Sequence, residues 1–184
     1  MARLGGCATA AELRSLVTPG ALNSAVQRGA VERLARGVYG LPVLGPDRLA
    51  AIAYDGVLSY TSAAVAWGLP VLVRPEKPHV TVPAQRRPRP GRPAELHWAP
   101  VSAAERAARL TSPLRTVLDC SRVLPFGEAL AVADAALSTW GLTKDELEAG
   151  ADALRGPGRP NAVRVACEAI RARRAFSSRC CGAC

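Results

Sequence analysis

The alternation of apolar and polar positions is most informative near the N-terminus, where it predicts two short helices. Thr9 can act as an N-cap, and Glu12 three positions later completes a Thr-x-x-Glu capping box, so we predict a first helix over residues 10–16. Thr18 followed by Pro19 marks the start of a second helix. Two helices joined by so short a connection form a helix-turn-helix.

The second helix divides into an apolar face and a polar face. We expect it to end at Gly29, because glycine tolerates the left-handed conformation that ends many helices. Leu22 and Val26 lie four positions apart, so they share the inward face. The outward face carries side chains of the kinds that read base edges and bind phosphates. These residues are Asn23, Ser24, Gln27 and Arg28.

The segment after this helix predicts a hairpin of the kind called a wing. Val31 and Leu34 are apolar positions among charged ones, and the turn at 35–37 ends in a glycine. The hairpin carries Arg33 and Arg36, which we expect to lie near the end of the second helix, at the edge of a DNA groove. An ordinary packed helix-hairpin unit has the same pattern, so this segment alone leaves both interpretations open.

The rest of the chain mixes short helices and strands, which predicts an α+β fold. We expect strands at 71–73, 79–82 and 96–98, and helices at 46–54, up to Trp67, from Pro113, and at 126–140, 143–154 and 161–174. The domain organisation follows from this pattern. We predict a winged helix-turn-helix domain at 1–44, a mixed α/β domain with a small sheet and C-terminal helices at 45–174, and a disordered Cys-rich tail at 175–184.

A proline-rich loop at 83–93 separates two of the predicted strands, because proline cannot take part in a strand ladder. One interpretation is an arginine arm that follows phosphates or enters a minor groove, and the other is a solvated hairpin tip. Nothing in the sequence fixes this loop relative to the wing. The possible accessory DNA contacts are Arg86, Arg87, Arg89 and Arg92.

The sequence does not indicate a catalytic or metal site. His79 and His97 fall in successive predicted strands, where paired histidines ordinarily pack and hydrogen-bond, and neither has a Cys, an Asp or a second His at metal-ligand spacing. Phosphate-loop, dinucleotide and Gly-x-Ser-x-Gly motifs are also missing. We therefore expect no catalytic residue, no bound metal, no cofactor and no enzyme activity.

Composition adds little to this picture. The formal charge of +9 comes from 22 Arg and 2 Lys, a bias that a GC-rich genome would also produce, so it is only compatible with a nucleic-acid partner. The sequence has neither an apolar run of membrane-spanning length nor an export signal, so we expect a cytoplasmic protein that does not bind membranes. In a reducing compartment its six cysteines would be free thiols.

Four segments together resemble the AbiEi-type antitoxins of actinobacteria, which regulate transcription in type IV toxin-antitoxin or abortive-infection systems. The segments are residues 9–42, VLSYTSAAVAWGLP at 57–70, PHVTVP at 78–83 and LTSPLRTVLDCSRVLP at 110–125. They occur in the same order as in that family. The resemblance implies that the winged helix binds double-stranded DNA, which favours Asn23, Gln27, Arg28, Arg33 and Arg36 as contacts.

The resemblance also implies a function. We expect a DNA-binding transcriptional regulator that represses its own promoter and counteracts a toxin encoded nearby. Many relatives continue into a domain similar to very-short-patch-repair endonucleases, and we expect that domain to be missing or truncated here. Two alternatives remain. One is a protein-interaction module, marked by an exposed apolar patch, and the other is a non-catalytic remnant of a two-domain nuclease-like protein.

Overall fold

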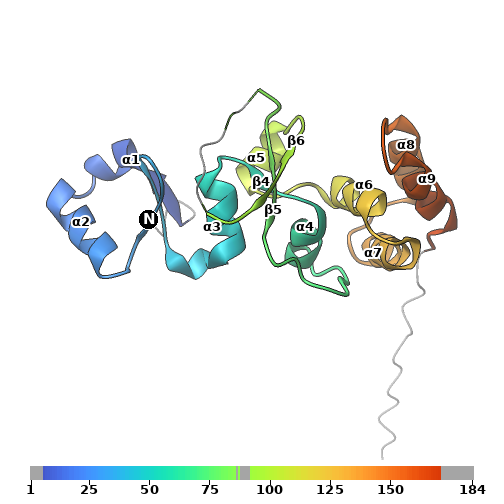
Figure 1. The fold of residues 1–184 in the computed structure, drawn as a ribbon, viewed down its shortest axis with the longest axis horizontal. Coiled ribbons are helices and arrows are strands. Elements are labelled where there is room, and N and C mark those ends of the chain that lie inside the picture. The colour runs from blue at the N-terminus through green and yellow to red at the C-terminus, as the bar shows by residue number, and fades with distance from the viewer. Residues whose placement is uncertain (1–5, 86, 88–91, 171–184) are drawn as a thin grey trace, which may run out of the picture.

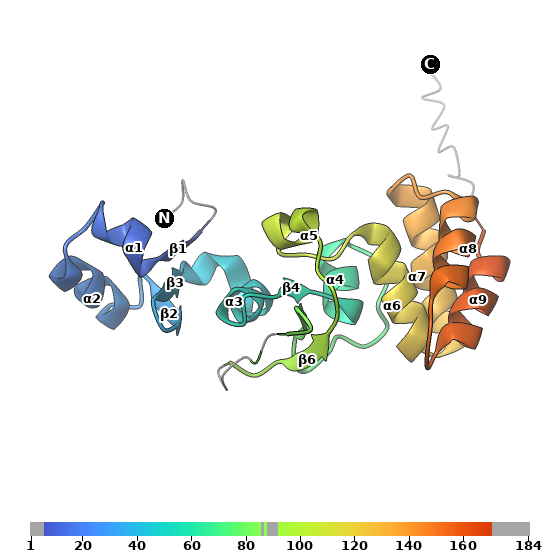
Figure 2. The ribbon, with the colours of Figure 1, turned by 90° about the horizontal axis from the view of Figure 1, so that it is seen from above.

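The chain has the predicted α+β fold, in a computed structural model that describes residues 6–85, 87 and 92–170. Three parts follow one another along the long axis of the molecule (Figure 1 and Figure 2). A small helix-and-sheet unit stands at the N-terminal end, a second small sheet with its helices lies in the middle, and a helical bundle forms the other end.

The N-terminal unit combines two helices with a three-stranded antiparallel sheet, in which the strands lie in the order β1-β3-β2. This arrangement is consistent with a winged helix-turn-helix. Strand β1, which the sequence did not predict, adds a third strand beside the wing. The elements are β1 (Cys7–Thr9), α1 (Ala10–Arg14), α2 (Pro19–Gln27), β2 (Glu32–Ala35) and β3 (Val38–Gly40).

The predicted signals at the ends of both helices are present. The backbone N–H of Thr9 donates to the Glu12 carboxylate over 2.7 Å, and the N–H of Glu12 donates to the Thr9 hydroxyl over 3.3 Å, which completes the capping box. The Thr18 hydroxyl caps α2, and Gly29 follows that helix with φ of +69°. Helix α1 ends at Arg14, two residues earlier than predicted.

Helix α3 (Gly45–Ala53) packs on both sides. It follows a short 3-10 turn, Pro42–Leu44. Leu49 and Ile52 pack against Leu34 of the wing sheet, whereas Ala50 and Ala51 join the core beneath the second sheet. All four of these α3 residues are buried, so α3 connects the N-terminal unit to the middle of the molecule without a linker.

The second sheet contains β4 (Val57–Leu58), β5 (His79–Val82) and β6 (Glu95–Trp98) in that order. Strands β4 and β5 are antiparallel, and β5 and β6 are parallel. The predicted strand at 71–73 is wrong, since Leu72 and Val73 lie in a loop and are 78% and 74% exposed. The fully buried Val57–Leu58 pair with β5 instead, because they can hydrogen-bond to a neighbouring strand and be covered by helices.

Helix α4 (Tyr60–Ala66) lies beside this sheet, and α5 (Ala103–Ala108) leads toward the bundle (Figure 2). The Trp67 indole N–H donates to the Thr111 carbonyl over 2.9 Å, and its ring meets the Trp140 ring edge-on at 4.6 Å. Trp67 therefore joins α4 to the bundle.

The bundle consists of α6 (Pro113–Val123), α7 (Phe126–Thr139), α8 (Lys144–Ala153) and α9 (Arg159–Glu168). Its core is mainly alanine, valine and leucine from all four helices. The last helix begins two residues earlier and ends earlier than the predicted 161–174, and the predicted tail at 175–184 lies outside the described residues. Among the described helices, none has both the length and the apolar character needed to cross a bilayer.

Candidate nucleic-acid interface

Helix α2 stands at the end of the molecule that is farthest from the bundle (Figure 1). None of its residues is fully buried. Asn23, Gln27 and Arg28 are exposed, and Ser24 is partly exposed. The polar side chains that the sequence places on the outward face of this helix are therefore accessible to solvent, as a recognition helix requires.

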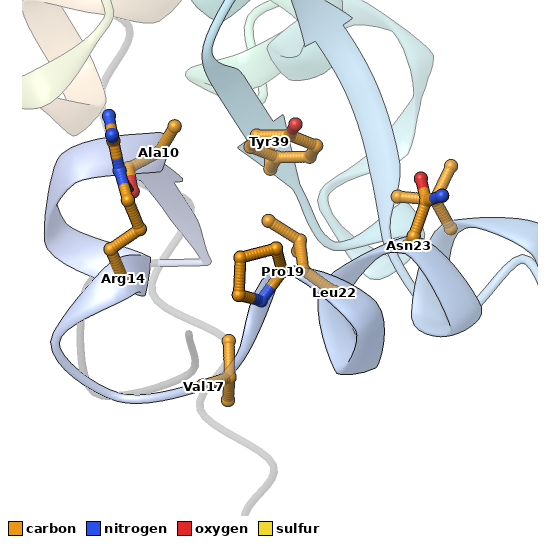
Figure 3. Close-up of a pocket in the computed structure, with 8 residues that line it drawn as sticks. Ala10, Arg14, Val17, Pro19, Leu22, Asn23 and Tyr39 are labelled. Carbon is orange, nitrogen blue, oxygen red and sulfur yellow. Dashed lines mark hydrogen bonds between the residues drawn. The ribbon is translucent and has the colours of Figure 1, made fainter.

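A cavity of about 430 Å³ separates the inner face of α2 from α1 and β3 (Figure 3). Leu22 and Val26 line it, so the predicted inward face is correct, but they meet an open cavity and Tyr39 instead of a closed core. Asn23 lies at one edge of the same cavity. The full lining is Ala10, Arg14, Val17, Pro19, Leu22, Asn23, Val26 and Tyr39.

The wing places Arg33 on the same side of the sheet as α2. Arg33 pairs with Tyr39 across the sheet, and directly opposite residues share a face. Because successive residues in a strand point to opposite faces, Leu34 faces the other way and packs on Leu49 of α3. Arg33 is exposed beside the helix-turn-helix.

Arg36 occupies the turn between β2 and β3, where Gly37 adopts φ of +75°. The backbone N–H of Ala10 donates to the Gly37 carbonyl over 2.7 Å, so this turn is bound to the start of α1. Arg28 precedes β2 and Arg36 follows it. A strand rises about 3.3 Å per residue, so the three positions from Arg33 to Arg36 span about 10 Å of extended chain. Arg33 and Arg36 therefore stand at different points along the hairpin.

The guanidinium groups of Arg28, Arg33 and Arg36 form no ion pair or hydrogen bond with any other residue in the described part of the chain. Most other described arginines are engaged, such as Arg109 with Asp55 at 2.8 Å. Side chains that are exposed and carry an uncompensated charge are those that can neutralise a phosphate.

Side-chain contacts that the sequence did not predict hold the end of the proline-rich loop. The Arg92 guanidinium forms an ion pair with Glu32 of β2, and the Arg92 carbonyl accepts a hydrogen bond from the Tyr54 hydroxyl. The end of the loop is thus attached to the wing sheet. Arg87 is exposed, while Arg86 and Arg89 lie outside the described residues. No local signal reveals a pair that lies sixty positions apart in the sequence.

Comparison with known proteins shows what the N-terminal unit is similar to. Residues 2–42 match the family model described as "Transcriptional regulator, AbiEi antitoxin", so this segment resembles an AbiEi-type antitoxin domain. The match covers the helix-turn-helix and the wing. The segments between 57 and 125, which also resemble this family in sequence, lie outside the matched residues.

The chain has a similar fold to the crystal structure of RV2827C protein from Mycobacterium tuberculosis, with a TM-score of 0.53. The alignment covers 90% of this chain and 74% of that chain, at 14% sequence identity. At this identity the likeness concerns the fold alone. No curated protein matches the chain.

Proposed function

We propose that this chain represses its own promoter by sequence-specific DNA binding and counteracts a toxin encoded nearby. The observation that carries the proposal is the match of residues 2–42 to a transcription-regulating antitoxin family, because these residues build the exposed helix-turn-helix and the wing. An antitoxin that regulates transcription does not need to catalyse a reaction, and we infer that the chain has no enzyme activity.

In the proposed complex, α2 enters a major groove of double-stranded DNA. Asn23 and Gln27 contact base edges, since their amide groups can both donate and accept hydrogen bonds. The remaining contacts go to the backbone. They are made by Ser24, Arg28, Arg33 and Arg36.

The spread of the arginines suits this role. Phosphates follow one another about every 3.4 Å along the axis of each strand. Arginines about 10 Å apart along the hairpin can therefore reach different phosphates, and each can neutralise its own charge. Arg92 does not belong to this surface, because its guanidinium is bound to Glu32. Among the accessory arginines, Arg87 is exposed and could reach a flanking phosphate.

The proposal can be tested by fluorescence anisotropy of the reduced protein with a labelled fragment of its own upstream region and a scrambled control, across a salt series. We expect tighter binding to the native fragment, with the preference surviving about 0.2 M salt. Arg28→Gln should weaken binding to both fragments and reduce the salt slope by about one unit. Arg74→Gln is the matched control, because it removes the same charge from an exposed loop residue outside the interface.

Asn23 provides a separate test of base reading. Asn23→Ala should change the preference among operator variants by about 1–3 kcal/mol, the discrimination that one amide-to-adenine pair supplies. An unchanged preference would remove Asn23 from the readout. Equal losses in Arg28→Gln and Arg74→Gln would show that only overall charge matters.

A protein-interaction role is the second candidate, and a specific feature favours it. Leu72 and Val73 are exposed apolar residues beside a cavity of about 470 Å³ at the edge of α7. Its lining is Pro70, Val71, Leu72, Leu124, Gly127, Glu128 and Ala131. Exposed apolar surface of this kind is typical of contact sites. Binding that is equal for both DNA fragments and abolished by salt would make this surface the more important one.

A further inference from the structure

Strands β5 and β6 bring three potential metal ligands to one face of the middle sheet. The strands are parallel, with His79 paired to Glu95 and Thr81 paired to His97. Glu95 and His97 are two positions apart in β6, so they share a face, and His79 lies opposite Glu95 on that face. A search for ligand spacing within one strand misses these three residues, because their meeting depends on the register between two strands.

The side chains converge as the register requires. Nδ1 of His79 lies 2.9 Å from Nε2 of His97, and Nε2 of His79 lies 3.8 Å from a carboxylate oxygen of Glu95. One ligand atom from each of the three side chains falls within 4.8 Å of the other two. Within the described residues, this is the one group of three His, Cys, Asp or Glu side chains that meets that geometry.

The surroundings hold the two imidazoles in position. The Tyr60 ring stacks on His97 with 4.0 Å between ring centroids and lies 5.8 Å from His79. Tyr60 adopts φ of +50°, a left-handed conformation that residues with a side chain rarely adopt. The fold therefore maintains a strained backbone at the residue that covers the pair.

Both imidazoles present a ring nitrogen to the same point. The imidazole nitrogens of His79 and His97 that face each other are candidate ligand atoms. A neutral imidazole offers a lone pair, which is the condition for metal ligation. Without a metal ion, the two rings share one proton across the 2.9 Å contact.

A polar cavity of about 440 Å³ borders the site, with His97 in its lining. Thr81 and Asp119 also line this cavity; the Thr81 hydroxyl is buried without a hydrogen-bond partner among the described residues, and Oδ2 of Asp119 lies 3.5 Å from Nε of Arg115. Buried polar atoms are ordinarily satisfied by protein or by water. A cavity with such atoms is suited to hold water or a polar ligand next to His97.

We propose that His79, Glu95 and His97 bind one divalent transition-metal ion of the zinc class, with water from the adjoining cavity completing its coordination. Two imidazole nitrogens and one carboxylate oxygen are a ligand set that Zn²⁺ accepts with an open fourth position. Magnesium and calcium fit less well, because they prefer oxygen ligands alone. Metal entry replaces the shared proton, which moves to the outer nitrogen of its ring.

The site needs only a small adjustment to accept the ion. Nitrogens about 2.0–2.1 Å from a tetrahedral zinc lie about 3.4 Å apart, so the rings must separate by about 0.5 Å and turn slightly. Glu95 can follow, because its side chain is 60% exposed. This proposal is independent of DNA binding by the winged helix.

The test uses the full chain with Cys180, Cys181 and Cys184 changed to serine, because thiolates also bind zinc. Zn²⁺ is titrated in competition with a chromophoric chelator, and Co²⁺ serves as a spectroscopic probe. We expect one ion per chain and a cobalt spectrum with ligand-field bands but no thiolate charge-transfer band. Binding that disappears in the serine background would overturn the proposal.

Two variants locate the ion. Glu95→Gln and His97→Asn should each weaken Zn²⁺ binding by at least about tenfold, since loss of an outer-shell partner alone costs about 10- to 100-fold. Glu76→Gln, an exposed carboxylate just before β5, is the matched control and should bind like the parent. Glu95 is exposed, so its variant separates loss of a ligand from loss of the fold. Parental affinity in both ligand variants would also refute the site.

Discussion

Gly158 is the point at which the end of α6 touches the start of α9. It is the N-cap of α9 and adopts φ of +79°. A Cβ atom placed on it would lie 2.4 Å from the carbonyl oxygen of Arg122 and 2.7 Å from the Arg122 Cβ. The side chain of Arg122 also donates from Nε to the Pro157 carbonyl over 3.0 Å. A side chain at Gly158 must therefore push backbone against backbone.

Gly158→Ala should destabilise the bundle for two separable reasons. A left-handed conformation costs a residue with a Cβ about 1–2 kcal/mol, and forced overpacking adds about 1–3 kcal/mol. The lower entropy of the unfolded alanine chain returns about 0.4–1 kcal/mol. The net loss is about 1–4.5 kcal/mol. Gly141→Ala is the matched control, because Gly141 adopts φ of +69° with no atom within 4 Å of its Cβ position.

The difference between the two variants therefore measures the contact itself, about 1–3 kcal/mol. For a chain of this size, each kcal/mol shifts Tm by about 2–4 °C, so Gly158→Ala should melt about 2–12 °C below Gly141→Ala. Thermal and urea unfolding followed by helical circular dichroism would measure both. Equal Tm values would show that α6 and α9 do not meet as described, and the reasoning would fail.

Two further predictions concern titratable groups. Burial raises the pKa of the Cys120 thiol to about 12, so at pH 9 only about one molecule in a thousand carries the reactive thiolate. A short iodoacetamide treatment of the native protein, read by peptide mass spectrometry, should modify exposed Cys167 and spare Cys120, and equal labelling would contradict the packing of α6. In α8, hydrogen bonds from the backbone N–H and the hydroxyl of Thr143 lower the pKa of Glu146. A lowered folded-state pKa means that this capping box stabilises the protein above the unfolded-state pKa and stops doing so as pH falls through the folded-state pKa. Glu146→Gln should flatten the dependence of urea midpoints on pH between about pH 3 and 6, whereas a parental profile would exclude the capping box as its source.

The elements that the sequence predicted well are those whose signals lie within one helical turn. The capping box at Thr9, the cap and proline at Thr18, and the capping box at Thr143 all start helices where expected. Each signal needs only a side chain and a backbone N–H three positions away. Helix α5 had the same signal, Ser102 followed by Glu105, and could have been found in the same way.

The features that the sequence did not predict depend on residues far apart in the chain. An apolar run such as 71–73 satisfies a strand pattern, but its exposure depends on whether a neighbouring strand and a covering helix are available. The pairing of Arg92 with Glu32 and the meeting of Glu95 with the two histidines depend on tertiary structure. Ligand geometry between strands cannot be derived without the register.

Helix α3 has a further consequence for how a bound protein would be positioned. It is buried against the wing on one side and against the middle sheet on the other, so the bundle is held in a set orientation relative to the N-terminal unit, which is the end proposed to bind DNA. On an operator with two half-sites, the helical phase of the duplex then decides where two bundles stand. Half-sites separated by whole turns of about 10.5 base pairs place both on one side of the DNA, and half a turn more places them on opposite sides. In such a complex α3 fixes the position of each bundle relative to its half-site, so the operator spacing determines whether two copies can touch.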